Sequence, residues 1–280
     1  MTNKEAPTSL APLPAQACLP INRCNLPCRL LGSLAFQRQP QALYIDGVRS
    51  LHHQLFSVLE AEADAVHRAR HFTNHMMASF QLNDPEALGY NANSHYPGRF
   101  KTDYRQLLRG WLFNADGREG AVLKGWVESR FGLQARNHGQ PIADRDDPAY
   151  RRYQREQAHG LYNTNALHAQ LDVLYSYCQY ELHRQHAHTR HLMLYRGINH
   201  LAELEVVATG DRQQRIVLLN NINSFTSDRE RADEFGDQII RTQVPLAKLV
   251  FVPGLIPGLL QGEQEHLVIG GLYEVTLEGL

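Results

Sequence analysis

Apolar residues in the first two thirds of the chain recur at the spacing of α-helices. From Ser50, a candidate N-cap, to the Asp-Pro pair at 84–85, they return every three to four positions. Shorter patterns of the same kind cover Tyr104–Leu112 and Val122–Phe131. The strongest pattern is the single apolar face over Leu167–Leu182. This spacing predicts a helix-rich first part of the chain.

After about residue 190 the pattern changes to short runs rich in β-branched and aromatic residues. Pro-Gly and Gly-Gly pairs separate several of these runs, which is typical of strands joined by turns. The expected strands are Leu192–Arg196, Ile216–Leu219, Ile239–Val244, Leu249–Val252, Leu267–Ile269 and Tyr273–Leu277. Helices first and strands last predict an α+β fold rather than the β-α alternation of a doubly wound sheet.

The chain divides into three expected segments. Residues 1–38 carry five prolines and little periodicity, so we expect an N-terminal tail. Residues 39–190 form a helix-rich half of one domain, with a polar surface loop over Asn137–Asp147, and residues 191–280 form its β-rich half. No G-x-G-x-x-G motif follows a predicted strand, so a nucleotide would be bound by another device.

Composition and charge narrow the function classes. The 280 residues are 43% hydrophobic and 20% charged, which is typical of a globular protein with its own core. A net charge of -1 argues against nucleic-acid binding that rests on broad electrostatics. No apolar run is long enough to span a bilayer, and the N-terminus lacks a secretory pattern. The four cysteines show no C-x-x-C spacing, so we expect free thiols in a reducing cytoplasm.

The β-rich half contains three features that together suggest chemistry. The first is Tyr195-Arg196-Gly197 at the end of an apolar run. The Arg196 guanidinium can present a planar fork of donors to phosphate oxygens, and Gly197 would let a flat ligand approach the backbone. Taken alone, this feature is also explained by a strand-end arginine in a surface ion pair.

The second feature is the segment Asn223–Gly236, where a strand is expected to lead into a helix of about two turns. Ser227 and Glu230 fit a capping box, and the closing glycine fits the position after the helix. Ser224 would lie at the end of the strand, and Phe235 could offer its ring face to a planar heterocycle. The alternative is that these residues are ordinary capping and core residues.

The third feature is the pair of glutamates Glu263 and Glu265 after a Gly- and Pro-rich loop. If a strand begins at Glu265, both side chains point to the same side, about 6 to 7 Å apart. One carboxylate could stabilise a developing cation while the other accepts a proton from an incoming nucleophile. A solvated acidic turn is the alternative explanation.

The order of these features resembles a known enzyme class, the arginine–serine–glutamate mono-ADP-ribosyltransferases. The chain is more similar still to the NAD-dependent dinitrogenase reductase ADP-ribosyltransferases of nitrogen-fixing bacteria. The matching segments are Tyr195–Asn199, Asn220–Thr226, Arg231–Gly236 and Gly262–Glu265 through Gly270-Gly271. The resemblance implies an ADP-ribosyltransferase-type split, mixed β core, with the β-rich half as the NAD-binding and catalytic half.

The resemblance also implies a role for each matching residue. Glu265 would bind the nicotinamide-ribose hydroxyl and stabilise an oxocarbenium-like transition state, and Glu263 would prepare the acceptor. Arg196 would hold the phosphates and ribose side of NAD, Ser224 would orient Glu265, and Phe235 would lie against nicotinamide. The full set expected to bind NAD is Tyr195, Arg196, Gly197, Asn199, Ser224, Phe225, Thr226, Phe235 and Glu265. Many relatives read Ser-x-Ser here, whereas this chain has Ser-Phe-Thr, which keeps the second hydroxyl.

The implied reaction moves ADP-ribose from NAD, as co-substrate, to an arginine of the nitrogenase iron protein (dinitrogenase reductase), which would switch off nitrogen fixation. A P-II-type signalling protein is a further partner implied only by the resemblance. Two alternatives stay open: an NAD glycohydrolase or arginine-specific transferase with another target, and a non-catalytic NAD- or partner-binding regulator. We expect the loop Pro253–Gly262 to touch the target protein.

Histidines and cysteines do not lead us to expect a metal site. His67, His71 and His75 are spaced by four along one predicted helix, but no carboxylate completes a ligand set at a matching offset. A His-rich patch over 183–191 is best explained as a solvated connector. The histidine-containing segment Asn91–Phe100 is polar and aromatic enough to line a cleft.

Overall fold

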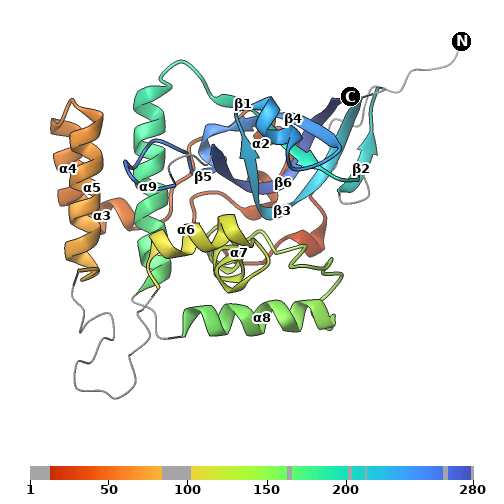
Figure 1. Ribbon diagram of the computed structural model, residues 1–280, viewed down its shortest axis with the longest axis horizontal. Helices are drawn as coiled ribbons and strands as arrows, with labels where there is room; N and C mark the ends of the chain where they lie inside the picture. Colours follow the sequence, from red (N-terminus) through yellow and green to blue (C-terminus); the bar gives the residue numbers. More distant parts are fainter. Residues whose placement is uncertain are drawn as a thin grey trace, which may run out of the picture.

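The computed structural model describes residues 13–83, 102–162, 166–200, 204–211, 213–260 and 264–278 (Figure 1). Long helices come first in the chain and strands come last. The predicted α+β class is therefore confirmed. Within the described ranges, no helix is both long enough and apolar enough to cross a membrane.

The helices before the sheet are α1 (Cys28–Leu31), α2 (Leu34–Arg38), α3 (Val48–Leu51), α4 (His53–Ala61), α5 (Ala65–Ser79), α6 (Tyr104–Phe113), α7 (Arg118–Phe131), α8 (Pro148–Leu161) and α9 (Leu167–Gln185). Helices α6, α7 and α9 match the predicted patterns, and the apolar face of α9 is buried. The apolar spacing did not predict α8. Its buried positions are Ala149 and Tyr153 alone, which is too thin an apolar stripe to give a periodic signal.

The first long helix predicted from the pattern is three helices, α3, α4 and α5. The chain leaves the helical conformation at His52 and at Glu62, and the Asp64 side chain caps α5. Part of the apolar pattern does not belong to the core, because Leu51 is 78% exposed and Val66 is 63% exposed. The apolar spacing correctly predicts helical structure here, but it does not show where one helix ends and the next begins.

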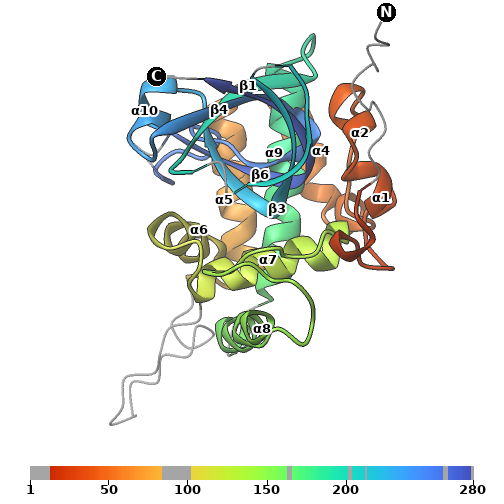
Figure 2. The same ribbon diagram turned by 90° about the vertical axis from the view of Figure 1, so that its right-hand side faces the viewer.

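The strands are β1 (His191–Ile198), β2 (Glu205–Thr209), β3 (Gln214–Thr226), β4 (Gln238–Pro245), β5 (Leu249–Phe251) and β6 (Glu265–Glu278), with the short helix α10 (Arg229–Asp233) between β3 and β4. Their order is β2-β3-β1-β4-β6-β5, and β3 also pairs with β6, so β3, β1, β4 and β6 close into a ring (Figure 2). Every pairing among the described strands is antiparallel, which corrects the mixed sheet we expected. Because the long helices precede the strands, they do not serve as the crossovers that parallel pairs need.

The last two predicted strands are one continuous strand, β6. Gly270 and Gly271, expected to form a turn, lie within it, opposite an irregularity of β3 between Leu219 and Ile222. Gly271 has a φ of 110°, and a Cβ on Gly270 would overlap the carbonyl of Asn220. These glycines let β6 bend, so that its first half pairs with β5 and its second half with β4. Strand β2 was not predicted, because almost all of it is exposed and it has no buried face.

The expected N-terminal tail is part of the fold over residues 13–38. Leu31 and Phe36 are at most 2% exposed and belong to the main core. The Gln37 amide donates to the carbonyl oxygen of Glu274 on β6 (3.3 Å) and accepts from the Glu274 N–H (2.8 Å). A proline precedes the first turn of α1, a position where its missing N–H costs nothing.

A buried ion pair joins two of the helices, and a buried lysine is bound to strand β6. Arg68 on α5 meets Glu181 on α9 in a two-pronged ion pair, with Nε–Oε1 at 2.7 Å and Nη2–Oε2 at 2.8 Å. The Lys248 Nζ donates to the Gly270 carbonyl oxygen at 2.8 Å and lies 4.6 Å from the centre of the Tyr273 ring. Complete burial lowers the pKa of Lys248 to about 7.

Candidate active site

Three strands meet where the predicted site residues lie. Tyr195 on β1 is paired with Thr226 on β3, and Thr226 is paired with Glu265 on β6. Directly paired residues share a face of a sheet, and residues two apart on one strand do so as well. Ser224 therefore lies on the same face as Glu265.

The Glu265 carboxylate is held by two donors. The Ser224 hydroxyl donates to Glu265 Oε1. The indole Nε1 of Trp111, on α6, lies 3.1 Å from the same carboxylate oxygen and 2.9 Å from Ser224 Oγ. Trp111 is 3% exposed, whereas Ser224 and Glu265 are partly exposed. Hydrogen bonds to a carboxylate are strong, so this pair of donors fixes the direction in which the carboxylate faces.

Arg196 joins the same group through the backbone. Its Nη1 donates to the carbonyl oxygen of Ser224 at 3.0 Å. An arginine stays protonated at any physiological pH. The site therefore places one permanent positive charge beside the serine that holds Glu265.

Gly197 is needed for a close approach between β1 and α10. A Cβ on Gly197 would overlap the carbonyl oxygen of Ala232, and a Cβ on Gly236 would overlap the backbone of Ile198. Two glycines therefore let two backbones touch. We expected a flat ligand to lie beside Gly197. Where a Cβ of Gly197 would point, the backbone of α10 and of the turn after it fills that space.

Helix α10 differs from the prediction at both ends. Its N-cap is Asp228, whose side chain accepts from the Glu230 N–H at 2.9 Å, so the capping box expected from Ser227 is wrong. The helix is five residues long rather than two turns, and Phe235 follows it. Phe235 is 63% exposed, with the Arg231 guanidinium 5.8 Å from the centre of its ring.

The remaining residues expected to bind NAD lie in different environments. Phe225 is 2% exposed and lies on the opposite face of β3 from Ser224, so its side chain packs in the core. Thr226 is 7% exposed, and its Oγ1 accepts from the Asp228 N–H at 3.1 Å, which shapes the turn into α10. Asn199 is exposed just after β1. The structure thus brings Arg196, Ser224 and Glu265 together and packs Phe225 away from them.

Some predictions fall outside the described residues. Glu263 and the segment Asn91–Phe100 are among these. The loop 253–262 is described as far as residue 260, and its Leu255 and Leu259 are 6% and 5% exposed. These two leucines pack into the core and do not present a surface to a target.

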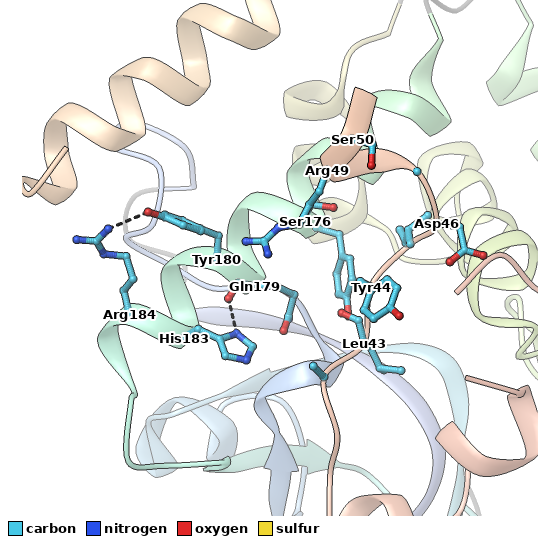
Figure 3. Close-up of a pocket in the computed structure, with 14 residues that line it drawn as sticks. Leu43, Tyr44, Asp46, Arg49, Ser50, Ser176, Gln179, Tyr180, His183 and Arg184 are labelled. Carbon is cyan, nitrogen blue, oxygen red and sulfur yellow. Dashed lines mark hydrogen bonds between the residues drawn. The ribbon is translucent and has the colours of Figure 1, made fainter. Parts of the chain in front are cut away.

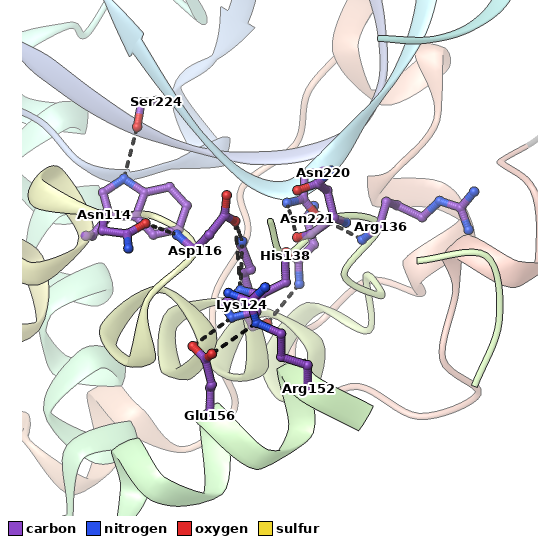
Figure 4. A network of polar contacts seen from close by, with 12 residues as sticks. Asn114, Asp116, Lys124, Arg136, His138, Arg152, Glu156, Asn220, Asn221 and Ser224 are labelled. Carbon is purple, nitrogen blue, oxygen red and sulfur yellow. Dashed lines mark hydrogen bonds and ion pairs between the residues drawn. The ribbon is translucent and has the colours of Figure 1, made fainter. Parts of the chain in front are cut away.

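A network of polar contacts joins Asp116, Lys124, His138 and Glu156 (Figure 4). The Lys124 Nζ, on α7, donates to Asp116 Oδ1 at 2.7 Å, lies 3.2 Å from His138 Nδ1 and lies 5.9 Å from the centre of the Trp111 ring. The other ring nitrogen of His138 lies 3.2 Å from Glu156 Oε2. Burial lowers the pKa of both Lys124 and His138, although the Asp116 charge opposes the shift of Lys124. Burial alone would raise the pKa of Asp116, but the ammonium holds it below its usual value, so we take this ion pair as charged.

Asparagines in the matching segment of β3 hold α7 in place. The Asn221 side chain donates to the carbonyl oxygens of Lys124 (2.8 Å) and Leu133 (3.1 Å). The Asn220 side chain donates to the carbonyl oxygen of Asn137 at 2.9 Å. These bonds tie the irregular part of β3 to the helix that carries Lys124.

A cavity of about 690 Å³ lies elsewhere, between the loop at 42–47, α3 and α9 (Figure 3). Arg49 lies 5.9 Å from the centre of the Tyr180 ring, and Arg184 donates to the Tyr180 hydroxyl at 2.8 Å. No residue of the predicted site lines this cavity. The candidate active site therefore rests on the chemistry of its side chains and not on the size of a cavity.

Within the described residues, no group of three or more His, Cys, Asp or Glu side chains could hold a metal ion. His75 instead has its Nε2 2.9 Å from His52 Nδ1, and burial lowers the pKa of both rings. Cys18 and Cys28 are free thiols whose sulfur atoms lie 2.7 Å apart. Cys28 lies in the core and Cys18 packs against it, so over residues 13–38 the thiols belong to a packed segment rather than to the expected tail.

Nothing in the sequence pattern singled out Trp111 or Lys124 as residues of the site. Both lie on helices whose apolar pattern indicates only core packing. Trp111 contacts Ser224 and Glu265 across 113 and 154 residues of chain, and no local spacing signals such a contact. A tryptophan N–H needs a partner when it is buried, and this was the one available hint.

Comparison with known proteins agrees with the resemblance. The family model described as dinitrogenase reductase ADP-ribosyltransferase (DRAT) matches residues 21–277. A curated protein of Rhodospirillum rubrum, NAD(+)--dinitrogen-reductase ADP-D-ribosyltransferase, is 40% identical over 262 residues, which cover 91% of this chain and 93% of that protein. No solved structure matches the chain. The chain therefore belongs to the dinitrogenase reductase ADP-ribosyltransferase family.

Proposed function

We propose that this protein is a mono-ADP-ribosyltransferase that moves ADP-ribose from NAD to an arginine of the nitrogenase iron protein and so inactivates it. Family membership supports the activity, and the name of the Rhodospirillum relative gives NAD and dinitrogen reductase as its substrates. The observation that carries the proposal is the convergence of Arg196, Ser224 and Glu265 from three strands. The proposal assigns the reaction to the cytoplasm, where the four free thiols would persist.

The first step needs a negative group close to the sugar. When the bond between ribose and nicotinamide breaks, the electron pair leaves with nicotinamide, which becomes neutral, and the ribose becomes positive. A carboxylate placed in advance stabilises this charge without reorganisation. Glu265 suits this role, because two donors already orient it. Arg196 would bind the phosphates, and the exposed ring of Phe235 would lie against nicotinamide.

The second step needs a base for the acceptor. An arginine side chain is a poor nucleophile because it is protonated. Glu263 would position the acceptor guanidinium and take its proton as the new bond to the ribose carbon forms. The products are ADP-ribosylated arginine, nicotinamide and one proton.

The test is incubation with labelled NAD, with and without purified nitrogenase iron protein. We expect label on an arginine of the iron protein. Free ADP-ribose without labelled protein would favour an NAD glycohydrolase instead. No turnover of NAD under either condition would favour a non-catalytic binding protein.

Two variants separate the proposed steps. Glu265→Gln should abolish both transfer and NAD hydrolysis, because both pass through the positive ribose. Glu263→Gln should lose transfer to protein and keep part of the hydrolysis. Equal loss of both activities in Glu263→Gln would contradict this division. Glu274→Gln is the matched control, because this glutamate pairs with Arg38 in the second half of the same strand.

A further inference from the structure

The Trp111 indole contacts both the candidate reaction centre and the Lys124 ammonium, which is paired with Asp116. Its Nε1 lies 2.9 Å from Ser224 Oγ and 3.1 Å from Glu265 Oε1. We propose that Trp111 is a positioning residue whose N–H holds the Ser224 hydroxyl and the Glu265 carboxylate in the orientation that NAD cleavage needs. The role of Glu265 rests on the proposed function, whereas the contact itself rests on geometry alone.

The hydrogen-bonding capacities of the three groups fix their directions. An indole N–H donates and cannot accept, and an ionised carboxylate accepts and cannot donate. The Ser224 hydroxyl has one proton, which it gives to Glu265, so it accepts from Trp111 through a lone pair. Without the indole N–H, the serine hydroxyl would gain rotational freedom and the carboxylate would lose a donor.

The ring is itself held in place by its surroundings. Trp111 is 3% exposed and lies on the buried face of α6, together with Leu107 and Leu108. The Lys124 Nζ lies 5.9 Å from the ring centre, is almost fully buried and donates to Asp116 at 2.7 Å. Because Asp116 fixes the ammonium, a positive charge stays over the indole, where the ring attracts it. The Trp111 ring, on α6, thus contacts both the Lys124 ammonium of α7 and the Glu265 carboxylate.

A space-filling role for Trp111 makes different predictions. If the ring only filled the core, phenylalanine would replace it with a modest loss of stability and an unchanged rate of NAD cleavage. A positioning role requires the N–H, so Trp111→Phe should lower kcat for NAD hydrolysis by between about tenfold and a hundredfold, the value of a hydrogen bond to a charged group. The KM for NAD should change less, because the interaction matters most when the ribose is positive.

A direct test uses the two tryptophans of the chain. Each indole N–H donates to a carboxylate: Trp111 to Glu265, and Trp126 to Asp172 at 2.7 Å. In protein labelled with ¹⁵N-tryptophan, the two indole resonances are assigned with Trp126→Phe. We expect Glu265→Gln to shift the Trp111 resonance and leave the Trp126 resonance in place, and NAD to shift the Trp111 resonance as well.

Two more variants complete the test. Lys124→Met should shift the Trp111 resonance and lower kcat severalfold, because the ring loses the charge that fixes it. Phe113→Ala is the control on the same helix: this side chain is 94% exposed and should affect neither resonance nor hydrolysis. The proposal is overturned if Glu265→Gln leaves the Trp111 resonance unmoved, or if folded Trp111→Phe keeps its kcat within about twofold. A wild-type protein that cleaves no NAD would refute the proposed function instead, and the resonance shift would still report the contact.

Discussion

Replacing Gly197 by alanine tests whether the close approach of α10 to β1 sets the NAD site. An ideal Cβ on Gly197 would overlap the carbonyl oxygen of Ala232 and lie 3.0 Å from both the Gly236 nitrogen and the Phe235 carbonyl carbon. These are backbone atoms, so no side chain can rotate away to make room. The added methyl group must therefore push α10 and its following turn away from β1.

The size of the effect follows from this geometry. Overpacking a well-packed position costs about 1–3 kcal/mol, and we expect a loss of about 2 kcal/mol in the free energy of unfolding because backbone must move. Phe235 lies two residues after the end of α10, and its N–H donates to the Ala232 carbonyl oxygen at 3.1 Å, so its ring moves with the helix. If that ring packs against nicotinamide, the KM for NAD should rise by about tenfold, equivalent to about 1.4 kcal/mol. Urea unfolding and steady-state NAD hydrolysis measure the two effects.

Gly210→Ala provides the matched control. An added Cβ there lies 3.2 Å from the Gln214 Cβ and 3.6 Å from the Gln214 carbonyl oxygen and Oε1, in the turn between β2 and β3, so it overlaps no backbone atom. Its stability should stay within about 0.5 kcal/mol of the wild type, with an unchanged KM. A Gly197→Ala protein with wild-type stability and KM would refute the reasoning, because α10 would then not depend on the missing side chain.

Two further predictions concern buried charges. Glu181→Gln leaves the Arg68 guanidinium buried without its carboxylate, so the free energy of unfolding should fall by about 3–5 kcal/mol, and Arg68→Met with Glu181→Leu should recover most of it. Urea unfolding of Arg68→Met, Glu181→Leu and the double variant measures this coupling, and strictly additive losses would contradict the pairing. Lys248→Met tests pH dependence: because burial lowers the pKa of Lys248 from 10.5 to about 7, the unfolded chain binds a proton in this window that the folded chain does not. The stability of the wild type relative to Lys248→Met should therefore rise between these pH values, by at most about 1.4 kcal/mol per unit, and a flat difference would exclude this origin.

The order of motifs was enough to select residues that the fold brings together. Arg196, Ser224 and Glu265 each lie near the end of a strand, and antiparallel pairing between β3 and β6 places Ser224 beside Glu265. Their proximity is an observation, whereas their catalytic roles stay predictions. The sequence could support the selection because the resemblance ties these residue types to one known arrangement.

Other parts of the fold could not be predicted, for identifiable physical reasons. Helices α1 and α2 have four and five residues, too few to show a period of 3.6, so a buried segment looked like a tail. The N-cap of α10 is Asp228 and not Ser227, and the sequence alone does not distinguish them because both residue types are favoured N-caps. Trp111 reaches Glu265 only through the packing of α6 against the sheet, and a pattern along one helix carries no record of that contact.

The contact between Gln37 and β6 has a consequence for synthesis. The carbonyl group that Gln37 binds belongs to a residue 237 positions later in the chain. At about 5–20 residues per second, a ribosome needs on the order of ten to fifty seconds to make that stretch. Until then the sheet is not there to pack against Leu31, Leu34 and Phe36. The nascent chain therefore exposes a hydrophobic segment to solvent. Residues 13–38 are thus synthesised early and packed late. We expect chaperones that bind exposed hydrophobic segments to bind the nascent protein during this interval.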